Sequence, residues 1–163
     1  MLALPWLLVC AIYDLRSRTV PAWLTIPPLI LAIARTAENG NWPIVLLSIS
    51  LITMDDLPWR ARGFLGSLQG FLLILAWHGS GLPGLALGVT LLVIWLVWKL
   101  GAIGGADAQV LMALALFFQP GILVPVAIAG GIQGLIQWLR KKPTLPAMLA
   151  IFAGTLFHLF LSH

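Results

Sequence analysis

Two aspartates, Asp14 and Asp107, are the residues of this sequence whose type and position could do chemistry. Each lies at the end of an apolar stretch, where an ionisable side chain is costly to place and is a functional candidate by default. Two carboxyl groups within reach of each other can share one proton. One then acts as a base on water while the other acts as an acid toward a carbonyl group. The pair therefore indicates hydrolysis, provided that the fold brings together two residues far apart in the chain.

Both aspartates also allow other interpretations. Asp107 could cap a helix that begins beside it, where a negative charge meets the positive end of the helix dipole. Asp14 could pair at the surface with Arg16 or Arg18. Either acid could also be the proton relay of a small proton-coupled transporter. We find no clear internal repeat, and both acids lie at segment ends, which favours hydrolysis over transport.

The elements that must position these acids are expected to be membrane helices. Of the 163 residues, 61% are hydrophobic and only 9% are charged, and the mean hydropathy is +1.04. A soluble domain of this length needs more charged surface, so lipid is the expected solvent. No strand alternation competes, since open sheets are excluded from lipid. The apolar segments run roughly over 1–13, 22–37, 43–54, 62–78, 82–100, 107–119, 121–139 and 144–161. We predict one all-α domain over residues 1–163, a membrane helix bundle in which six to eight of these eight segments span the bilayer.

The distribution of Lys and Arg predicts the orientation of this bundle. If every segment crosses, one side of the membrane holds Arg16, Arg18, Arg60, Arg62, Lys99, Arg140, Lys141 and Lys142. The other side holds only Arg35. Cytoplasmic loops carry an excess of Lys and Arg, so the first side is predicted to be cytoplasmic and both termini extracytoplasmic. Asp14 and Asp107 then share the cytoplasmic face.

The backbone beside each acid is predicted to be non-helical. The stretch Gly101-Ala102-Ile103-Gly104-Gly105 has little helix propensity and interrupts the chain just before Asp107. Val20-Pro21 stops any helix before segment 22–37 and pushes Val20 toward extended geometry. Unwound backbone offers free N–H and C=O groups to which an extended substrate can bond as an added strand.

The remaining residue types indicate no other chemistry. The basic residues form no stripe with interleaved aromatics, so no nucleic-acid partner is expected. The single cysteine, Cys10, lies in an apolar run and is interpreted as a buried structural thiol. His78, His158 and His163 lie away from the acids, and no metal site or other cofactor is predicted. Lys99 is interpreted as a lysine whose ammonium group lies at the membrane–water interface, rather than as a group that changes the protonation of the two aspartates.

Small residues in segment 121–139 predict close helix packing. Gly130, Gly131 and Gly134 are spaced as in the small residues that let membrane helices approach each other. We therefore expect a neighbouring helix to lie against this glycine face.

The residues around the two acids form two motifs. The first reads Asp14-Leu15-Arg16-Ser17-Arg18-Thr19-Val20-Pro21-Ala22-Trp23-Leu24-Thr25, and the second reads Gly104-Gly105-Ala106-Asp107-Ala108-Gln109. In this order, and on one predicted membrane face, they resemble the motifs of the type IV prepilin peptidase family. This family, which includes the archaeal preflagellin peptidases, consists of GxGD-type membrane aspartic proteases. The tail from Pro143 to Ala150 is similar to the start of the family's last helix.

The resemblance implies an intramembrane aspartic endopeptidase of the inner (cytoplasmic) membrane that needs no metal. Asp14 and Asp107 would be its catalytic pair. Motif support or substrate binding would come from Arg16, Pro21, Thr25, Gly104, Gly105 and Ala106. The implied substrate is a single-helix precursor, pilin-like or archaellin-like, whose short basic leader is cut at the cytoplasmic membrane face. The chain lacks the cysteine-rich insertion of the large family members, so methylation of the new N-terminus is not expected.

Three positions depart from the family pattern. Ala22 replaces Asn, Gln109 replaces Lys, and Ala106 stands where the commoner motif has Gly. A Cβ at position 106 is expected to restrict the turn, because Gly alone enters positive φ freely. The departures keep open an alternative, namely a catalytically altered family member that serves as a scaffold in an assembly complex.

The interval between the two aspartates is longer than usual for the family by about one hairpin. We map this extra helical hairpin to residues 43–80. Its tip, Asp55-Asp56-Leu57-Pro58-Trp59-Arg60, is interpreted as a solvated turn in which the acids pair with Arg60 and Arg62. No oligomeric state is predicted.

Overall fold

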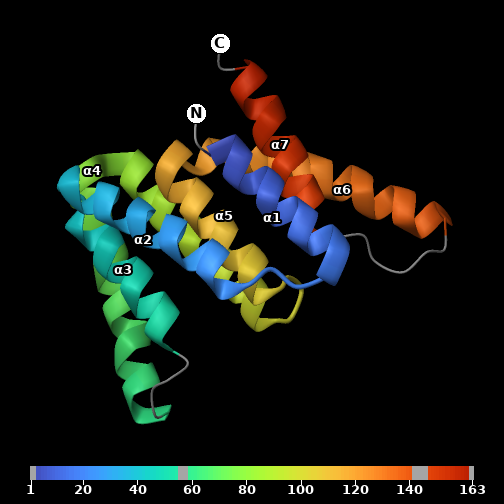
Figure 1. Cartoon of the computed structure of the whole chain (residues 1–163). Helices are drawn as coiled ribbons and strands as arrows, with labels where there is room; N and C mark the ends of the chain where they lie inside the picture. Colours follow the sequence, from blue (N-terminus) through green and yellow to red (C-terminus); the bar gives the residue numbers. More distant parts are fainter. Residues whose placement is uncertain (1–2, 55–58, 141–146, 162–163) are drawn as a thin grey trace.

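The computed structural model describes residues 3–54, 59–140 and 147–161, and within them the chain is helical (Figure 1). The elements are α1 (Ala3–Ser17), α2 (Ala22–Glu38), α3 (Trp42–Thr53), α4 (Trp59–Lys99), α5 (Gly105–Phe118), the short 3-10 helix η2 (Pro120–Ile122), α6 (Leu123–Arg140) and α7 (Ala147–Leu161). The described part of the chain contains no strand. The predicted all-α class is therefore confirmed.

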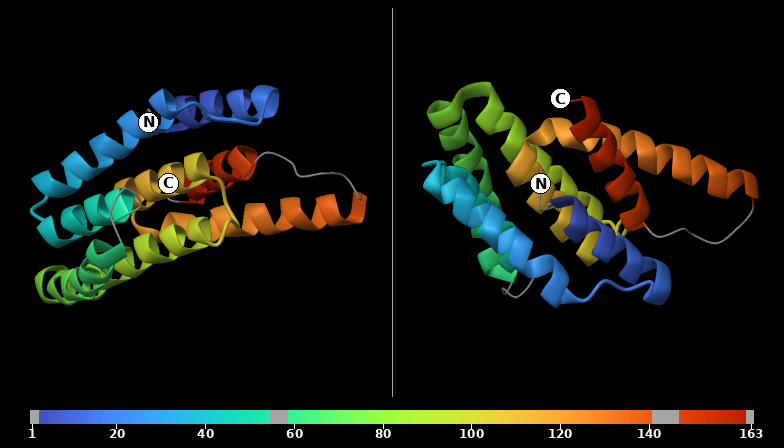
Figure 2. Two further views of the ribbon diagram at one scale, coloured as in Figure 1. Left: turned by 90° about the horizontal axis from the view of Figure 1, so that it is seen from below. Right: turned by 45° about the horizontal axis from the view of Figure 1, so that its top comes forward.

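The predicted segments 62–78 and 82–100 form two arms of the single element α4. At Gly81 the backbone has φ 64° and ψ −148°, which lies outside the helical region. Glycine reaches this conformation without steric cost because it has no Cβ. Figures 1 and 2 show the two arms meeting at this bend. Each remaining segment falls on one α-helix, except that the first residues of segment 121–139 belong to η2. The punctuation by polar residues, Pro and Gly therefore predicted the helices well.

The outside of the bundle is apolar. Phe64, Leu82 and Phe160 are 72%, 67% and 78% exposed, which suits lipid as the surrounding solvent. One described helix, Phe64–Lys99, is long and apolar enough to cross a bilayer, although it contains the Gly81 bend. Other apolar helices, such as Trp42–Thr53 and Gly105–Phe118, are shorter than 18 residues.

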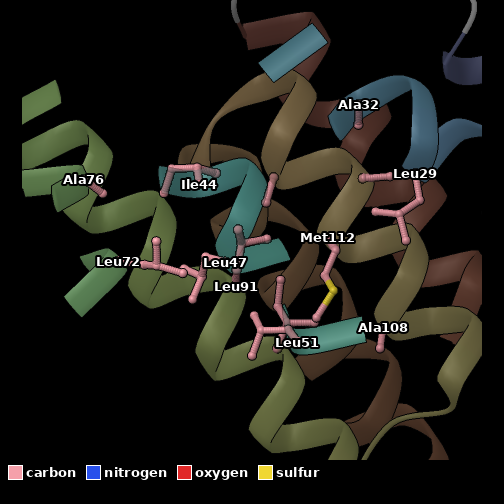
Figure 3. Packing of buried hydrophobic residues seen from close by; sticks show 13 residues of the cluster. Leu29, Ala32, Ile44, Leu47, Leu51, Leu72, Ala76, Leu91, Ala108 and Met112 are labelled. Carbon is pink, nitrogen blue, oxygen red and sulfur yellow. The ribbon is translucent and has the colours of Figure 1, made fainter. Parts of the chain in front are cut away.

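The interior consists of two apolar clusters that meet at α5. The first cluster joins α2, α3, α4 and α5 and includes Leu29, Leu47, Leu91 and Met112 (Figure 3). The second cluster joins α1, α5, η2, α6 and α7; its buried members are Leu7, Cys10, Ala11, Val110, Leu114, Ile122, Val126, Met148 and Ile151. Cys10 is fully buried, as predicted for a structural thiol.

Helix α3 and the first arm of α4 belong to the first cluster, so the 43–80 hairpin is part of the core. That it is an addition relative to the family stays a prediction. Residues 55–58 lie outside the described part of the chain. The interpretation of the hairpin tip as a solvated, ion-paired turn therefore stays a prediction.

Neighbours in space differ from neighbours in sequence. Helix α1 packs mainly against α7, and α7 against α6, whereas α5 packs mainly against α2 and α4. Figures 1 and 2 show the α1–α2 and α4–α5 connections at one end of the bundle. The α2–α3 turn, the Gly81 bend and the start of η2 lie at the other end. This alternation is the one expected from counting segments, and it places both acid-bearing motifs at the same end.

The close approach of α6 and α7 occurs at Gly154, not at the glycines predicted from segment 121–139. A Cβ added to Gly154 would lie 2.4 Å from Val126 Cα, so only a glycine lets these backbones touch. A Cβ on Gly131 would meet nothing within 4 Å, and one on Gly130 only the Ala150 Cβ at 4.0 Å. The prediction was therefore wrong for Gly131, because period and composition identify small residues but not the helix that faces them. The surroundings of Gly134 lie outside the described residues.

Candidate active site

Asp14 lies near the end of α1 and is held by the start of α7. Its side chain is 9% exposed, and its Oδ2 accepts a hydrogen bond of 3.2 Å from the backbone N–H of Met148. Met148 is the second residue of α7. The first N–H groups of a helix have no partner inside the helix, and the positive end of its dipole favours a negative charge. The N-terminus of α7 therefore binds and stabilises the Asp14 carboxyl group.

The surface-pairing interpretation of Asp14 is wrong. In the described part of the chain, Asp14 is buried, its carboxyl group accepts a hydrogen bond from a backbone N–H group, and Arg16 is exposed. Arg16 lies in the last turn of α1 and Arg18 follows the helix, and both residues are exposed. Arg16, predicted to support the motif, is not among the hydrogen-bond partners of either acid in the described part of the chain.

Asp107 lies in the first turn of α5 and is held locally. Its Oδ2 accepts a hydrogen bond of 3.3 Å from the backbone N–H of Gly104, the residue that precedes the helix. The helix-capping interpretation of Asp107 is thus confirmed. Capping does not use up the carboxyl group, because its two oxygens offer about four acceptor positions. Gly104 also leaves room for this side chain, since a Cβ there would lie 3.1 Å from Asp107 Oδ2.

The fold brings these two acids together. Their carboxyl groups are close enough for the charge of Asp14 to act on Asp107. They come from α1 and α5, whose apolar residues meet in the second cluster through Leu7, Val110 and Leu114.

The backbone before Asp107 is unwound, as predicted. Helix α4 ends at Lys99 and α5 begins at Gly105. In between, Gly101 has φ 72°, and Gly104 is extended with φ −71° and ψ 156°. Ala106 lies inside α5 and is not among the residues with positive φ, so the expected restriction by its Cβ was wrong. The left-handed position of this turn is Gly101, where the chain does carry a glycine.

The connection after Asp14 is also non-helical. Helix α1 ends at Ser17, Arg18 has φ 54°, and the chain leaves α1 through Thr19 and Val20. Pro21 then precedes α2 with φ −67° and ψ 144°, and its carbonyl accepts the N–H of Leu24 at 3.0 Å. Pro21 therefore stops the backbone from running helically into α2, as the sequence predicted.

The two motifs contact each other through Thr25 and Gln109. The Thr25 hydroxyl, fully buried, donates a hydrogen bond of 2.6 Å to Gln109 Oε1. Thr25 was predicted as motif support, whereas Gln109 was noted only as a departure from the family pattern. A second tie joins α1 to α2, where Trp6 Nε1–H donates to the Leu24 carbonyl at 2.8 Å.

Sequence reasoning missed Met148 and Trp6. The signal for Met148 was present in Pro146, which stands just before an apolar helix whose first N–H groups need an acceptor. No comparable signal exists for Trp6, because nothing in the sequence says which carbonyl an indole N–H will reach.

An aromatic and basic group borders the start of α5. The Trp98 Nε1 atom lies 3.4 Å from the place of a Gly105 Cβ, so Trp98 packs beside the predicted motif residue Gly105. The exposed Lys99 ammonium lies 4.5 Å from the Trp98 ring centroid and 5.7 Å from that of Trp95. This cation–π arrangement at a helix end fits an interface lysine. Among the described residues, no three His, Cys, Asp or Glu side chains gather in a way that could hold a metal ion.

These features define a class: an all-helical protein with an apolar exterior that presents two interacting carboxyl groups, from separate helices, at one end of its bundle. The chain matches the model of the type IV leader peptidase family over residues 1–162, and it belongs to that family. The family is one of peptidases that act on leader sequences. Searches of curated proteins and of solved structures each find no significant match.

Proposed function

We propose that this protein is an aspartic endopeptidase that removes the basic leader of type IV pilin-like or archaellin-like precursors. The observation that carries the proposal is that Asp14 and Asp107, two acids from separate helices, lie near enough for one charge to act on the other, in a member of a leader peptidase family. The family gives the general reaction, and the pair of acids gives the residues that would perform it.

The proposed mechanism uses one proton shared by the two acids. The ionised carboxylate takes a proton from a water molecule, whose oxygen attacks the carbonyl carbon of the scissile peptide bond. The protonated carboxyl group gives its proton to the substrate carbonyl oxygen, so that a neutral tetrahedral intermediate forms. As this intermediate collapses, the carboxyl group that took the water proton gives it to the leaving amine, the other carboxylate takes a proton from a hydroxyl group of the intermediate, and the C–N bond breaks. The pair is then back in its starting state.

The surroundings of the acids suit a substrate that is a helix with an extended leader. The non-helical connections after Asp14 and before Asp107 lie at the same end of the bundle (Figure 1). Extended backbone in such connections can pair with an unwound stretch of substrate. The excess of Lys and Arg in the connections at this end favours the cytoplasmic face of the inner membrane, in a multi-pass protein with both termini outside.

Cleavage of a prepilin-like peptide by the protein in lipid tests this proposal. Asp14→Asn and Asp107→Asn each keep the size of the side chain and remove its ability to exchange a proton. We expect each to lower kcat by about 10²- to 10⁴-fold. Glu38→Gln is the matched control, because Glu38 is an exposed carboxylate at the end of α2, at the opposite end of the bundle, and should cleave at the wild-type rate.

The pH profile gives a second measure of the same pair. Activity needs exactly one proton on the two acids, so it should fall both when the second proton is lost at higher pH and when the base is protonated at lower pH. Normal cleavage by either Asn variant would rule out this catalytic pair. Loss of cleavage in both, with the wild-type rate in Glu38→Gln, supports it against a scaffold or a transporter.

A further inference from the structure

The hydrogen bond between Thr25 and Gln109 is a buried polar contact between α2 and α5. It is short, 2.6 Å, and the Thr25 side chain has no exposed surface. Within the described residues, the other acceptor near the Thr25 hydroxyl is the Ala22 carbonyl in its own helix, at 3.4 Å. A buried hydroxyl left without a good acceptor costs about 1–3 kcal/mol, so this contact strongly favours one placement of α5 against α2.

Gln109 and Asp107 leave α5 in opposite directions. They are two positions apart on a helix, which separates their side chains by about 200° around its axis. Gln109 points toward α2, which packs directly against α5. Asp107 lies on the face of α5 that also carries Val110 and Leu114, which pack in the second cluster with Leu7 of α1, the helix of Asp14. A bond that fixes Gln109 on one side of α5 therefore fixes the direction in which Asp107 points on the other.

The position of Asp14 is set by different helices. Helix α1 packs mainly against α7, and the Asp14 carboxylate is held by the start of α7. The side chains of α1 and α5 share the second cluster, but their backbones approach each other closely at few points, so this contact alone fixes the rotation of α5 only weakly. The rotation of α5 about its own axis must be fixed by its other neighbours, and Thr25 supplies a directional contact that apolar packing lacks.

We propose that Thr25 and Gln109 form a positioning pair, which sets the rotation of α5 and thereby aims the Asp107 carboxyl group at Asp14. The proposal rests on the peptidase function proposed above and names two further residues that the reaction needs. Neither residue touches the reacting atoms; both act through Asp107.

The pair also explains how Gln can stand where the resembling motif has Lys. The Gln109 amide oxygen accepts the Thr25 hydroxyl proton. A lysine has no acceptor, but its ammonium can donate to Thr25 Oγ1 while the hydroxyl turns to the Ala22 carbonyl. Gln109→Lys should therefore keep a link between α2 and α5, whereas Gln109→Leu, similar in size, should lose it.

The test measures peptide cleavage by four variants. Thr25→Val and Gln109→Leu each remove one half of the pair with little change of shape. We expect each to lower kcat about tenfold to a hundredfold with KM unchanged, because a small misplacement of a reacting group is costly. The double variant should be no slower than the slower single variant, since either change already breaks the contact. Thr25→Ser restores the hydroxyl and should restore most of kcat.

Thr36→Val is the matched control. Thr36 lies on the same helix α2, is 6% exposed, and donates its hydroxyl to the Ala32 carbonyl of its own helix at 2.8 Å. Removing this hydroxyl takes away a buried hydrogen bond without freeing α5 to rotate. Its kcat should stay within about twofold of the wild-type value.

A second measurement does not depend on cleavage. Infrared carboxyl bands followed against pH, with Asp14→Asn and Asp107→Asn to assign them, report how strongly the two acids influence each other's titration. Thr25→Val should change that coupling and Thr36→Val should not. Coupling and kcat in Thr25→Val that equal the wild-type values would overturn the positioning pair. Absence of cleavage by the wild-type protein would instead overturn the proposed function, and the infrared result would still decide on the pair.

Discussion

Asp14 and Asp107 are the same kind of residue at the same end of the bundle, but they are held in opposite ways. Asp107 takes its hydrogen bond from Gly104, three residues earlier in its own turn. Asp14 takes its hydrogen bond from Met148, at the other end of the chain. One acid is positioned by local structure and the other by the tertiary fold.

This difference divides the supports of the pair between two groups of helices. Asp107 depends on α5, which is embedded between α2 and α4. The position of Asp14 depends on α1, which packs mainly against α7. Helix α7 in turn packs on α6. Changes in α6 and α7 should therefore act on Asp14 while leaving Asp107 in place, and changes in the α4–α5 connection should do the reverse.

The largest effect is expected where α6 meets α7. In Gly154→Ala the new Cβ would lie 2.4 Å from Val126 Cα and 2.8 Å from the Pro125 carbonyl oxygen, both backbone atoms that cannot move aside cheaply. We expect a loss of about 3 kcal/mol in unfolding free energy, measured by denaturation in detergent. Gly131→Ala, which meets nothing within 4 Å, should change it by less than about 1 kcal/mol. Equal losses in both would show that α6 and α7 do not meet at Gly154.

The direct support of Asp14 can be removed with Met148→Pro. Proline is tolerated in the first turn of a helix, so α7 should persist without the N–H group that Asp14 accepts. Met148 is also buried, so Met148→Ala is needed to measure the loss of its side chain alone. We expect kcat of the Pro variant to lie about 30-fold below that of the Ala variant, as for a lost hydrogen bond of about 2 kcal/mol to a charged group. Equal rates would mean that α7 does not hold Asp14.

The local support of Asp107 is best tested at Gly104. Its φ of −71° suits any residue, so Gly104→Ala strains no backbone. The added Cβ would instead press on Asp107 Oδ2 from 3.1 Å and displace the carboxyl group by a few tenths of an ångström. We expect a loss of about tenfold in kcat, or about 1.4 kcal/mol, without a loss of stability. Gly70→Ala on α4 meets nothing within 4 Å and serves as the control. A wild-type rate in Gly104→Ala would show that Asp107 is not held by the turn before it.

The contrast between the two acids also explains what could be predicted from the sequence. The apolar segments and their Pro and Gly boundaries predicted the helices, because these are local properties of the chain. The capping contact of Asp107 was foreseen for the same reason, since it joins residues three positions apart. Counting the apolar segments then predicted both motifs at one end of the bundle, where the structure has them (Figure 1).

Contacts between distant residues could not be predicted in the same way. The partner of Asp14 is a backbone N–H, a group that every residue but proline carries, so the residue type of Met148 itself gave no indication. Pro146 marked where the last helix begins, but not that Asp14 lies opposite to it. Gly131 and Gly154 are alike in sequence, and only the facing helix distinguishes an open position from a close contact. In the sequence Gln109 is a departure from the motif, and only the fold shows that it accepts a hydrogen bond from Thr25. In each case the missing information was which helix faces which.

The smallest effect is expected at Trp6, and it tests whether α1 depends on α7 alone. The Trp6 indole N–H donates to the Leu24 carbonyl at 2.8 Å and is a tie between α1 and α2. Trp6→Phe removes this donor and keeps an aromatic ring, so we expect a loss of about 1 kcal/mol in stability and less than about fivefold in kcat. Trp42→Phe, at an exposed position that starts α3, should change neither. If Trp6→Phe instead lowered kcat as much as Met148→Pro, α2 would position Asp14 as firmly as α7 does. Helix α2 would then help to position both acids, Asp14 through α1 and Asp107 through α5.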